Sequence, residues 1–164
     1  GNPLFGTLLG LITQDDFLLG LMDLPISRER WWATIESGTY YQGKRCSTSS
    51  IKKIQESRLA CTSPAIFSAV EMNQFQKLAK SVQVERYGGD CFNYGALACG
   101  WVELVAEASL QFYDIAALVV IIQEAGGIVT DWSGEPIQMG WNGTALAAAN
   151  LDLHRQALEL LNQS

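Results

Sequence analysis

Residue types that bind transition metals are scarce in this sequence. It contains one histidine, His154, and four cysteines, none of them in a Cys-x-x-Cys spacing. Structural zinc sites use closely spaced sets of such ligands, so the sequence argues against a zinc site. Each cysteine has apolar or small neighbours, which is typical of free thiols, although a disulfide stays open. The four are Cys46, Cys61, Cys91 and Cys99.

Basic residues and long apolar runs are also few. The chain has 11 Lys and Arg against 17 Asp and Glu, a net charge of −6 and a pI of about 4.7. Without a basic stripe, binding to nucleic acid is not expected. No apolar run has the length of a membrane span, and no signal peptide precedes the first residues. We therefore expect a cytoplasmic protein that binds neither nucleic acid nor membrane.

The single histidine falls in the amphipathic pattern of a predicted C-terminal helix. Asn150 is the expected N-cap of this helix, and Leu153 belongs to its apolar stripe. His154 stands near Asp152 and Arg155. We interpret it as a solvated surface residue without a catalytic role.

The first part of the chain has the alternation and turn signals of an antiparallel sheet. The expected strands are 7–13, 17–23 and 30–35, with a hairpin turn at 14–16. The polar segment Ser47–Ser50 interrupts the pattern. We predict a first unit of antiparallel strands over 1–50 and a second, α/β unit over 51–164.

The second unit alternates strand and helix patterns. The expected strands are 59–61, 82–87, 101–106, 128–129 and 145–149, and the expected helices are 71–80, 92–100, 115–125 and a last one after Asn150. With 164 residues, 48% of them hydrophobic, the chain can bury a real core. The pattern predicts a layered α/β fold with right-handed crossovers.

One helix in this unit is apolar on every side. It runs from Ile115 to Ala125, so it must be covered on more than one face. Gly126 supplies a left-handed stop, and Ile128 begins a strand. Asp114 stands at the start of this helix, where an acidic residue either caps free backbone amides or binds a cation. The two roles are compatible.

Asp114 also has an acidic partner, Glu107, seven residues upstream. This arrangement resembles the second signature of the inositol monophosphatase superfamily, whose members are Mg²⁺-dependent phosphomonoesterases. The likeness is strong from about Arg86 to Gly134. It implies that Asp114 is a metal ligand and that Glu107 holds the alcohol part of the substrate. It also implies the C-terminal half of a layered α-β-α-β-α sandwich.

The resemblance does not extend to the rest of the family's metal site. The family gathers its cations with a Glu on one segment and with an Asp-Pro-Ile/Leu-Asp-Gly-Thr loop, and neither occurs here. Residues 1–7 resemble the segment that follows this loop. One carboxylate cannot assemble a Mg²⁺ site alone. We therefore expect a fragment that lacks the N-terminal half and is inactive by itself.

A glycine pair forms the second informative cluster, Gly88-Gly89-Asp90, between a predicted strand and helix. Two glycines allow a tight turn with Asp90 as an N-cap, or a close approach to a ligand. In the family this loop faces the alcohol part of the substrate. With Glu107, Asp90 would give that pocket two negative charges, which favour a cationic alcohol. The runs 86–91, 113–118 and 130–134 resemble most the histidinol-phosphate phosphatase branch. The charge argument agrees with this resemblance, because histidinol carries an ammonium group and an imidazole.

Other functions stay open at this point. The substrate of the complete enzyme could be inositol 1-phosphate or another sugar phosphate. A different class is a non-catalytic module that has lost its metal loop and serves as an oligomer. A nucleotide-binding domain is disfavoured because no Gly-x-Gly-x-x-Gly follows a first strand. The absent half would cover one side of the first strands, so we expect a homodimer or higher homo-oligomer through that sheet.

Overall fold

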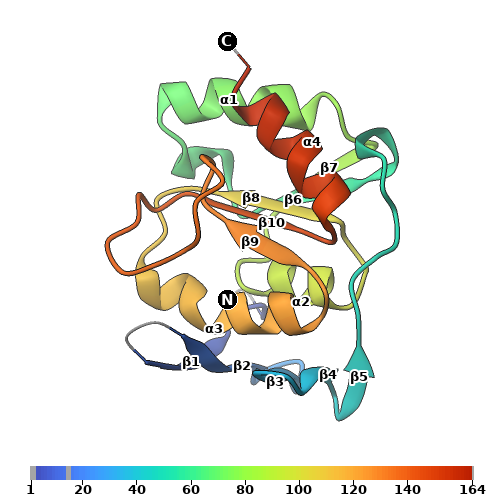
Figure 1. Ribbon diagram of the computed structural model, residues 1–164, viewed down its shortest axis with the longest axis vertical. Coiled ribbons are helices and arrows are strands. Elements are labelled where there is room, and N and C mark those ends of the chain that lie inside the picture. Colours follow the sequence, from blue (N-terminus) through green and yellow to red (C-terminus); the bar gives the residue numbers. More distant parts are fainter. Residues whose placement is uncertain (1–2, 14–15, 164) are drawn as a thin grey trace.

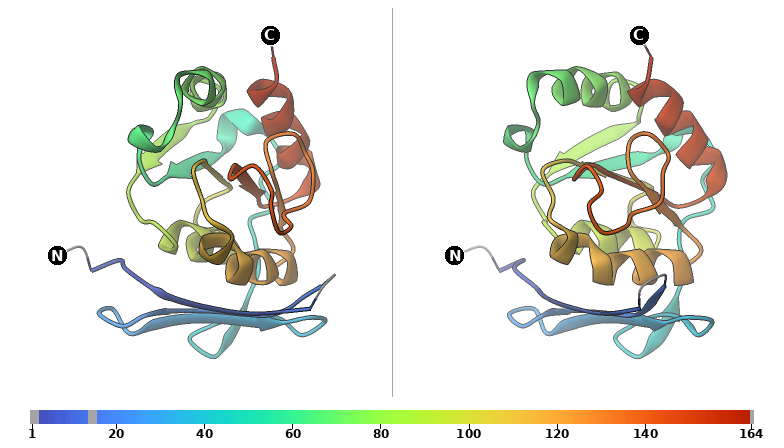
Figure 2. Two further views of the ribbon diagram at one scale, coloured as in Figure 1. Left: turned by 90° about the vertical axis from the view of Figure 1, so that its left-hand side faces the viewer. Right: turned by 60° about the vertical axis from the view of Figure 1, so that its left-hand side comes forward.

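The computed structural model describes residues 3–13 and 16–163. This part of the chain forms four layers: an antiparallel sheet, two helices, a mixed sheet and an outer pair of helices (Figure 1). Both views in Figure 2 separate the first sheet from the remaining layers. The predicted α/β class, with antiparallel strands followed by alternating strands and helices, is confirmed.

The first sheet is a meander of five strands in chain order. They are β1 (Thr7–Ile12), β2 (Phe17–Leu24), β3 (Glu29–Thr34), β4 (Gly38–Tyr41) and β5 (Lys44–Cys46). The three predicted strands are therefore present, within one or two residues at each end. Of the predicted hairpin turn, Gln14 and Asp15 lie outside the described residues.

The second sheet has the order β7-β6-β8-β10-β9. Strand β6 runs parallel to β7 and β8, whereas β10 is antiparallel to both of its neighbours. The strands are β6 (Arg58–Cys61), β7 (Val84–Tyr87), β8 (Leu104–Glu107), β9 (Ile128–Thr130) and β10 (Ala145–Ala148). The helices are α1 (Ala69–Ala79), α2 (Phe92–Ala98), α3 (Phe112–Glu124) and α4 (Leu151–Leu161), with single 3₁₀ turns at Ile54–Glu56 and Pro64–Ile66.

A glycine ends each of the inner helices, and the sequence predicted this role for Gly126 only. After α3, the Gly126 amide donates to Gln123 O and the Gly127 amide to Ile122 O, which is a Schellman cap. The same cap follows α2, where Gly100 has φ +72°. The cap uses residues 100 and 101, so the predicted strand at 101–106 is wrong in its first residues and begins at Leu104.

Helix α3 lies between the two sheets (Figures 1 and 2). Every residue from Ile115 to Ile122 is buried, as expected for a helix that is apolar all round. On the side that faces the first sheet, the close approach of α3 to the strands depends on a glycine. A Cβ atom on Gly20 would lie 2.0 Å from the carbonyl oxygen of Ala117, so no larger residue fits without displacing the helix.

The opposite side of the first sheet is largely apolar and carries no further layer in the described residues (Figure 2). Gly10 and Gly20 pair with each other and face α3, so their strand neighbours point away from it. We call the apolar part of this side the outer face: Leu9, Leu11, Leu19, Leu21, Trp32 and Tyr40. The ion pair of Asp23 and Arg30 lies on the same side of the sheet. Trp32 and Tyr40 stack at a centroid distance of 4.4 Å.

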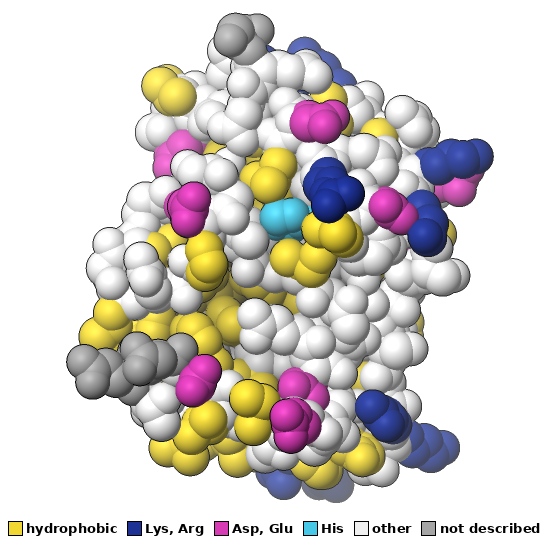
Figure 3. Space-filling view, in the orientation of Figure 1, with side chains coloured by type: hydrophobic (Ala, Val, Ile, Leu, Met, Phe, Trp, Pro, Cys, Tyr) yellow, Lys and Arg dark blue, Asp and Glu magenta, His cyan; other side chains and the backbone are white. Residues whose placement is uncertain are grey.

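Charged side chains are dispersed over the surface. On the face shown in Figure 3, Lys and Arg stand in small separate groups, some beside acidic residues. One such pair is Lys52 with Asp152, at 2.9 Å. All four cysteines are free thiols, as predicted. Among the described residues, no helix is both long enough and apolar enough to cross a membrane.

The prediction that His154 is a solvated surface residue is wrong. Asn150 caps α4 as expected, by accepting from the Leu153 amide, but His154 lies on the buried side of that helix and is only 5% exposed. Its Nε2 lies 2.8 Å from Thr130 Oγ1, which donates to the Asp131 carbonyl. The imidazole is therefore hydrogen-bonded inside the protein, not to solvent. Burial lowers the pKa of His154.

This buried imidazole predicts an acid-sensitive fold. Because the native pKa lies below the ordinary value of 6.5, the unfolded chain binds a proton at higher pH than the folded chain does. The free energy of unfolding should therefore fall as the pH drops from 6.5 toward the lower native pKa. Urea titrations at a series of pH values measure this slope.

The matched control is His154→Gln, which keeps a donor for Thr130 and cannot titrate. The slope that remains in this variant comes from other groups. Equal slopes in the two proteins would contradict the assignment of the acid sensitivity to His154.

Candidate active site

A cavity of about 390 Å³ opens where the carboxyl ends of β6 and β8 meet the amino ends of α2 and α3. Because β6 and β8 are parallel, the residues that follow them reach the same edge of the sheet. The cavity is lined by Phe5, Gly6, Leu8, Thr62, Ile66, Asp90, Cys91, Tyr94, Glu107, Ala108, Ser109, Leu110, Asp114 and Leu118. Three of the five predicted site residues, Asp90, Glu107 and Asp114, therefore share one cavity.

The other two predicted residues, Gly88 and Gly89, form the turn beside this cavity and do not line it. They have φ values of +90° and +107°, and Asp90 follows at +46°. A Cβ atom on Gly89 would lie 2.3 Å from Asn93 Oδ1. The glycines are thus explained by the turn that presents Asp90.

Asp90 is not the N-cap of α2. The N-cap is Cys91, and it makes no side-chain capping bond. The left-handed conformation of Asp90 instead leaves its carboxylate exposed at the rim of the cavity. This carboxylate accepts no hydrogen bond in the described part of the chain, so it is available to a ligand.

Asp114 also departs from its expected place. The N-cap of α3 is Gln111, and Asp114 stands three residues later, where its Oδ2 accepts from the Gln111 amide at 2.8 Å. This reciprocal arrangement is a capping box. It occupies one carboxylate oxygen, while Oδ1 has no hydrogen-bond donor among the described residues. Asp114 therefore combines the capping role with a free oxygen at the cavity.

Glu107 is the last residue of β8 and is 2% exposed. Its Oε1 accepts from the Thr62 amide at 2.9 Å and also from the Thr62 hydroxyl, and its Oε2 accepts from Tyr94 OH at 3.0 Å. Burial raises the pKa of Glu107, and so does Asp90, whereas the Thr62 and Tyr94 hydrogen bonds oppose this rise. Both oxygens of this carboxylate therefore already accept hydrogen bonds from the protein.

Sequence reasoning missed Thr62 and Tyr94, which hold Glu107 in place. Thr62 comes directly after β6, and a hydroxyl at the carboxyl end of a strand in a parallel pair was a usable signal. Tyr94 lies inside the apolar pattern of α2 and had no such signal. Its hydroxyl is fully buried, and burial together with Glu107 raises the pKa of Tyr94 well above its ordinary value.

The charged side chains that line the cavity are all acidic. Its lining contains three carboxyl groups and no Lys, Arg or His. The Cys91 thiol is protonated at neutral pH, because burial and Asp90 raise its pKa to about 11. A negatively charged phosphate would be repelled here unless a cation lay between, whereas a positively charged group would be attracted.

The residues that the structure describes do not form a complete Mg²⁺ site. Within the described residues, no cluster of three or more His, Cys, Asp or Glu side chains could hold a metal ion. Mg²⁺ needs near-octahedral oxygen coordination, and Asp114 offers one free carboxylate oxygen. The part of the chain in the structure can supply one ligand to a shared cation and cannot assemble the site.

A larger hollow, of about 580 Å³, lies at the first sheet and is lined by Asp23, Pro25, Arg28, Arg30, Trp32, Gln42 and Gly43. Its one carboxylate, Asp23, is already paired with Arg30 at 2.7 Å. It lies away from the strand ends and the helix amino ends that shape the smaller cavity. The smaller cavity is therefore the better candidate for a chemical site.

Comparison with known proteins identifies the class to which this fold and cavity belong. The profile of the Inositol monophosphatase family matches residues 1–164. The chain therefore belongs to the inositol monophosphatase family, a family of phosphatases. Its fold matches that of an inositol monophosphatase from Zymomonas mobilis with a TM-score of 0.96 and 36% identity, over 99% of this chain and 64% of that one.

Individual relatives show which members of the family the chain is similar to. The chain is 39% identical to the "Bifunctional phosphatase IMPL2, chloroplastic" of Arabidopsis thaliana, over 98% of this chain and 49% of that protein. It is 31% identical to a histidinol-phosphatase of Streptomyces coelicolor, over 99% of this chain and 64% of the relative. The chain thus spans about half to just under two thirds of these proteins.

The contacts of Glu107 predict the effect of removing one hydroxyl. Tyr94→Phe deletes the donor to Oε2 and leaves a buried carboxylate less well satisfied. The free energy of unfolding at pH 7 should fall by about 2 kcal/mol, as for other lost hydrogen bonds to buried charges. Urea denaturation measures it.

Tyr113→Phe provides the matched control, because Tyr113 is 75% exposed. It should change stability by no more than about 0.5 kcal/mol. Similar losses in the two variants would mean that the hydroxyl of Tyr94 does not stabilise Glu107.

Proposed function

We propose that this chain supplies the alcohol-binding side of the active site of a Mg²⁺-dependent phosphomonoesterase that hydrolyses histidinol phosphate. The observation that carries the proposal is the acidic cavity, which has three carboxyl groups and no basic residue in its lining. Relatives named as histidinol-phosphatases, at 31% and 29% identity, support the same substrate.

Asp90 is the residue that we expect to select the alcohol. Its carboxylate is exposed at the cavity rim, and the turn of Gly88 and Gly89 fixes its position. The ammonium group of histidinol can donate charged hydrogen bonds to it, which are roughly twice as strong as those from a neutral hydroxyl. In this proposal Glu107, held by Thr62 and Tyr94, adds negative charge behind the alcohol.

Asp114 has a different role in the proposal. Its free Oδ1 coordinates a divalent cation. The other ligands of this cation lie in the part of the relatives' sequences that this chain does not match. The cation would neutralise phosphate charge and activate water. Since the described residues do not complete such a site, no step of the hydrolysis is assigned to this chain, and we expect the chain alone to be inactive.

Two alternatives have specific support. The match to the Zymomonas mobilis protein favours inositol 1-phosphate or another sugar phosphate as substrate. The absence of a metal-binding cluster from the described residues is compatible with a non-catalytic module. Binding of a cationic alcohol separates the first proposal from both, because neither alternative requires it.

Histidinol itself therefore tests the proposal on this chain. In a nuclear magnetic resonance titration, histidinol should shift the amide signals of the loop at Asp90 and of Asp114, and myo-inositol should not. Asp90→Asn should weaken histidinol binding about tenfold, the loss of one charge-assisted contact.

Glu85→Gln is the control, since Glu85 is an exposed carboxylate outside the cavity lining. It should leave the affinity unchanged. If histidinol and myo-inositol bind equally, or if both variants weaken histidinol binding to the same extent, selection by Asp90 is refuted.

The predicted homo-oligomer belongs to the same proposal. The outer face places Leu9 and Leu11 at 55% exposure each, next to a free edge at β1. Such a face tends to associate. Sedimentation at micromolar concentration should detect dimers or larger species, and Leu9→Asp should reduce their fraction.

Val70→Asp is the comparison variant, because Val70 is 71% exposed on α1, far from the outer face in the layer order. It should not change the distribution. A strictly monomeric chain under these conditions would contradict association through the first sheet.

A further inference from the structure

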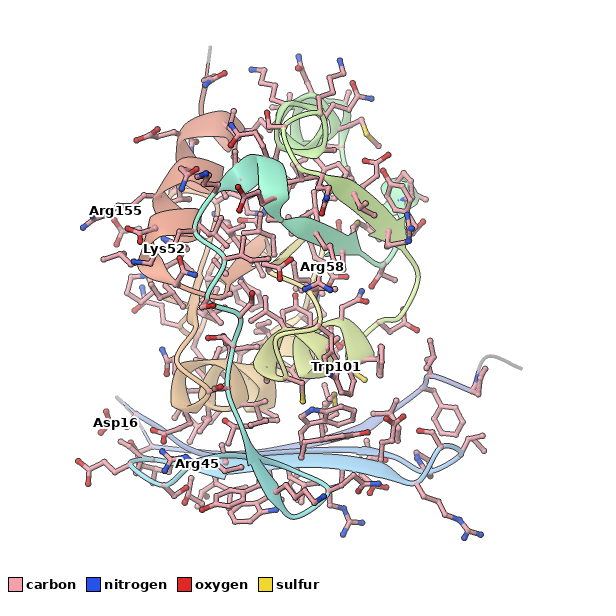
Figure 4. All side chains as sticks on the ribbon, turned by 90° about the vertical axis from the view of Figure 1, so that its right-hand side faces the viewer. Asp16, Arg45, Lys52, Arg58, Trp101 and Arg155 are labelled. Carbon is pink, nitrogen blue, oxygen red and sulfur yellow. The ribbon has the colours of Figure 1, made fainter. Side chains whose placement is uncertain are left out.

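Cys46 and Cys99 come together at the junction of the first sheet and the inner helices. Cys46 ends β5, and Cys99 is the C-cap of α2. Figure 4 labels Arg45, which precedes Cys46, and Trp101, which is two residues after Cys99. In this view the chain that leaves β5 rises past the end of α2. The backbones meet beside the two cysteines: a Cβ atom on Gly100 would lie 3.3 Å from Ser47 O.

The two side chains both lie in the space between the first sheet and the inner helices. Cys46 pairs with Thr39, whose hydroxyl donates to Ile121 O of α3, so this side of the sheet faces the helices. Cys46 Sγ lies 3.6 Å from Thr39 O. Cys99 Sγ accepts from Trp31 Nε1 at 3.2 Å. The two thiols lie close enough for each to change the pKa of the other.

These contacts make the two thiols unequal. The hydrogen bonds from Cys46 and Trp31 lower the pKa of Cys99, although burial opposes this effect. The same bond, together with burial, raises the pKa of Cys46. By comparison, burial raises the pKa of Cys61 to about 12. The Trp31 indole N–H, which donates to Cys99 Sγ, would stabilise a thiolate there, the nucleophilic form of the side chain.

We propose that Cys46 and Cys99 form a reversible disulfide when the protein meets a peroxide. Both side chains are partly exposed, so a small oxidant can reach them. This site does not depend on the proposed phosphatase function. It lies at the far end of α2 from the candidate active site.

The chemistry proceeds in two displacements. The Cys99 thiolate attacks one oxygen of hydrogen peroxide, the O–O bond breaks, and a sulfenic acid and water form after protonation. The Cys46 sulfur then attacks the Cys99 sulfur, and the S–O bond breaks with loss of a second water. Two thiols and one peroxide thus give one disulfide and two waters. Hydrogen peroxide is the only oxidant required.

The bond would tie two layers together. It would link β5 of the first sheet to the end of α2, and α2 carries Tyr94, which holds Glu107. Oxidation should therefore slow amide hydrogen exchange in α2. Unchanged exchange rates in an oxidised protein would overturn this consequence.

Peptide mapping tests the disulfide directly. The native chain is treated with hydrogen peroxide, free thiols are alkylated, and the protein is digested without reductant. Chymotrypsin, which cleaves after Phe92 and Tyr94, separates Cys91 from Cys99. We expect one linked peptide pair, Cys46 with Cys99, lighter by two hydrogens and separated by dithiothreitol.

Single variants resolve the order of the steps. In Cys46→Ser the sulfenic acid of Cys99 should accumulate and be trapped by dimedone. In Cys99→Ser neither a disulfide nor a trapped Cys46 should form at the same peroxide dose. Cys61→Ser, the control, should form the bond in full yield.

Two results would overturn the proposal. One is oxidation of Cys61 or Cys91 while Cys99 stays a free thiol. The other is an equal yield of the Cys46–Cys99 bond in urea-unfolded chain, because then the native geometry contributes nothing. Mapping of the unmodified sequence decides both, even if a serine variant fails to fold.

Discussion

The burial of α3 between two sheets is the constraint on which the rest of the structure depends. Its residues from Ile115 to Ile122 are covered on both sides, so neither sheet can be removed without exposing a continuous apolar surface. The first sheet comes close enough only because Gly20 has no side chain opposite Ala117. This packing positions the amino end of α3, and with it Asp114, at the end of the second sheet.

At that end, burial and charge act against each other. Glu107 is nearly inaccessible, and its charge is tolerated because Thr62 and Tyr94 donate to it. Asp90 and Asp114 remain more accessible, and each has at least one oxygen without a donor in the described residues. The cavity thus separates a carboxylate that shapes the site from two that can meet a ligand, and that division supports the proposed preference for a cationic alcohol.

Much of this arrangement could be predicted from local patterns. Gly126 and Asn150 act as predicted, because a left-handed helix end and an N-cap depend on a few neighbouring residues. Asp114 does cap α3, but from the third helical position, and of the two alternatives for Asp90 the N-cap is the one that the structure does not show. Gln111 begins α3 and the Asp90 backbone is left-handed, and the positions of these turns depend on contacts with other segments. The strand expected from residue 101 failed because the cap of α2 takes that residue first.

The sequence by itself determined the fold class and the buried helix, since hydrophobic period and glycine position are local properties. The acidic residues of the candidate site were proposed from the resemblance to a known family. Only the tertiary structure decided which groups meet. It buried His154 against Thr130, joined Tyr94 to Glu107 and brought Cys46 to Cys99. These partners are distant in the chain, and their proximity follows from how whole sheets and helices pack, which no local pattern encodes.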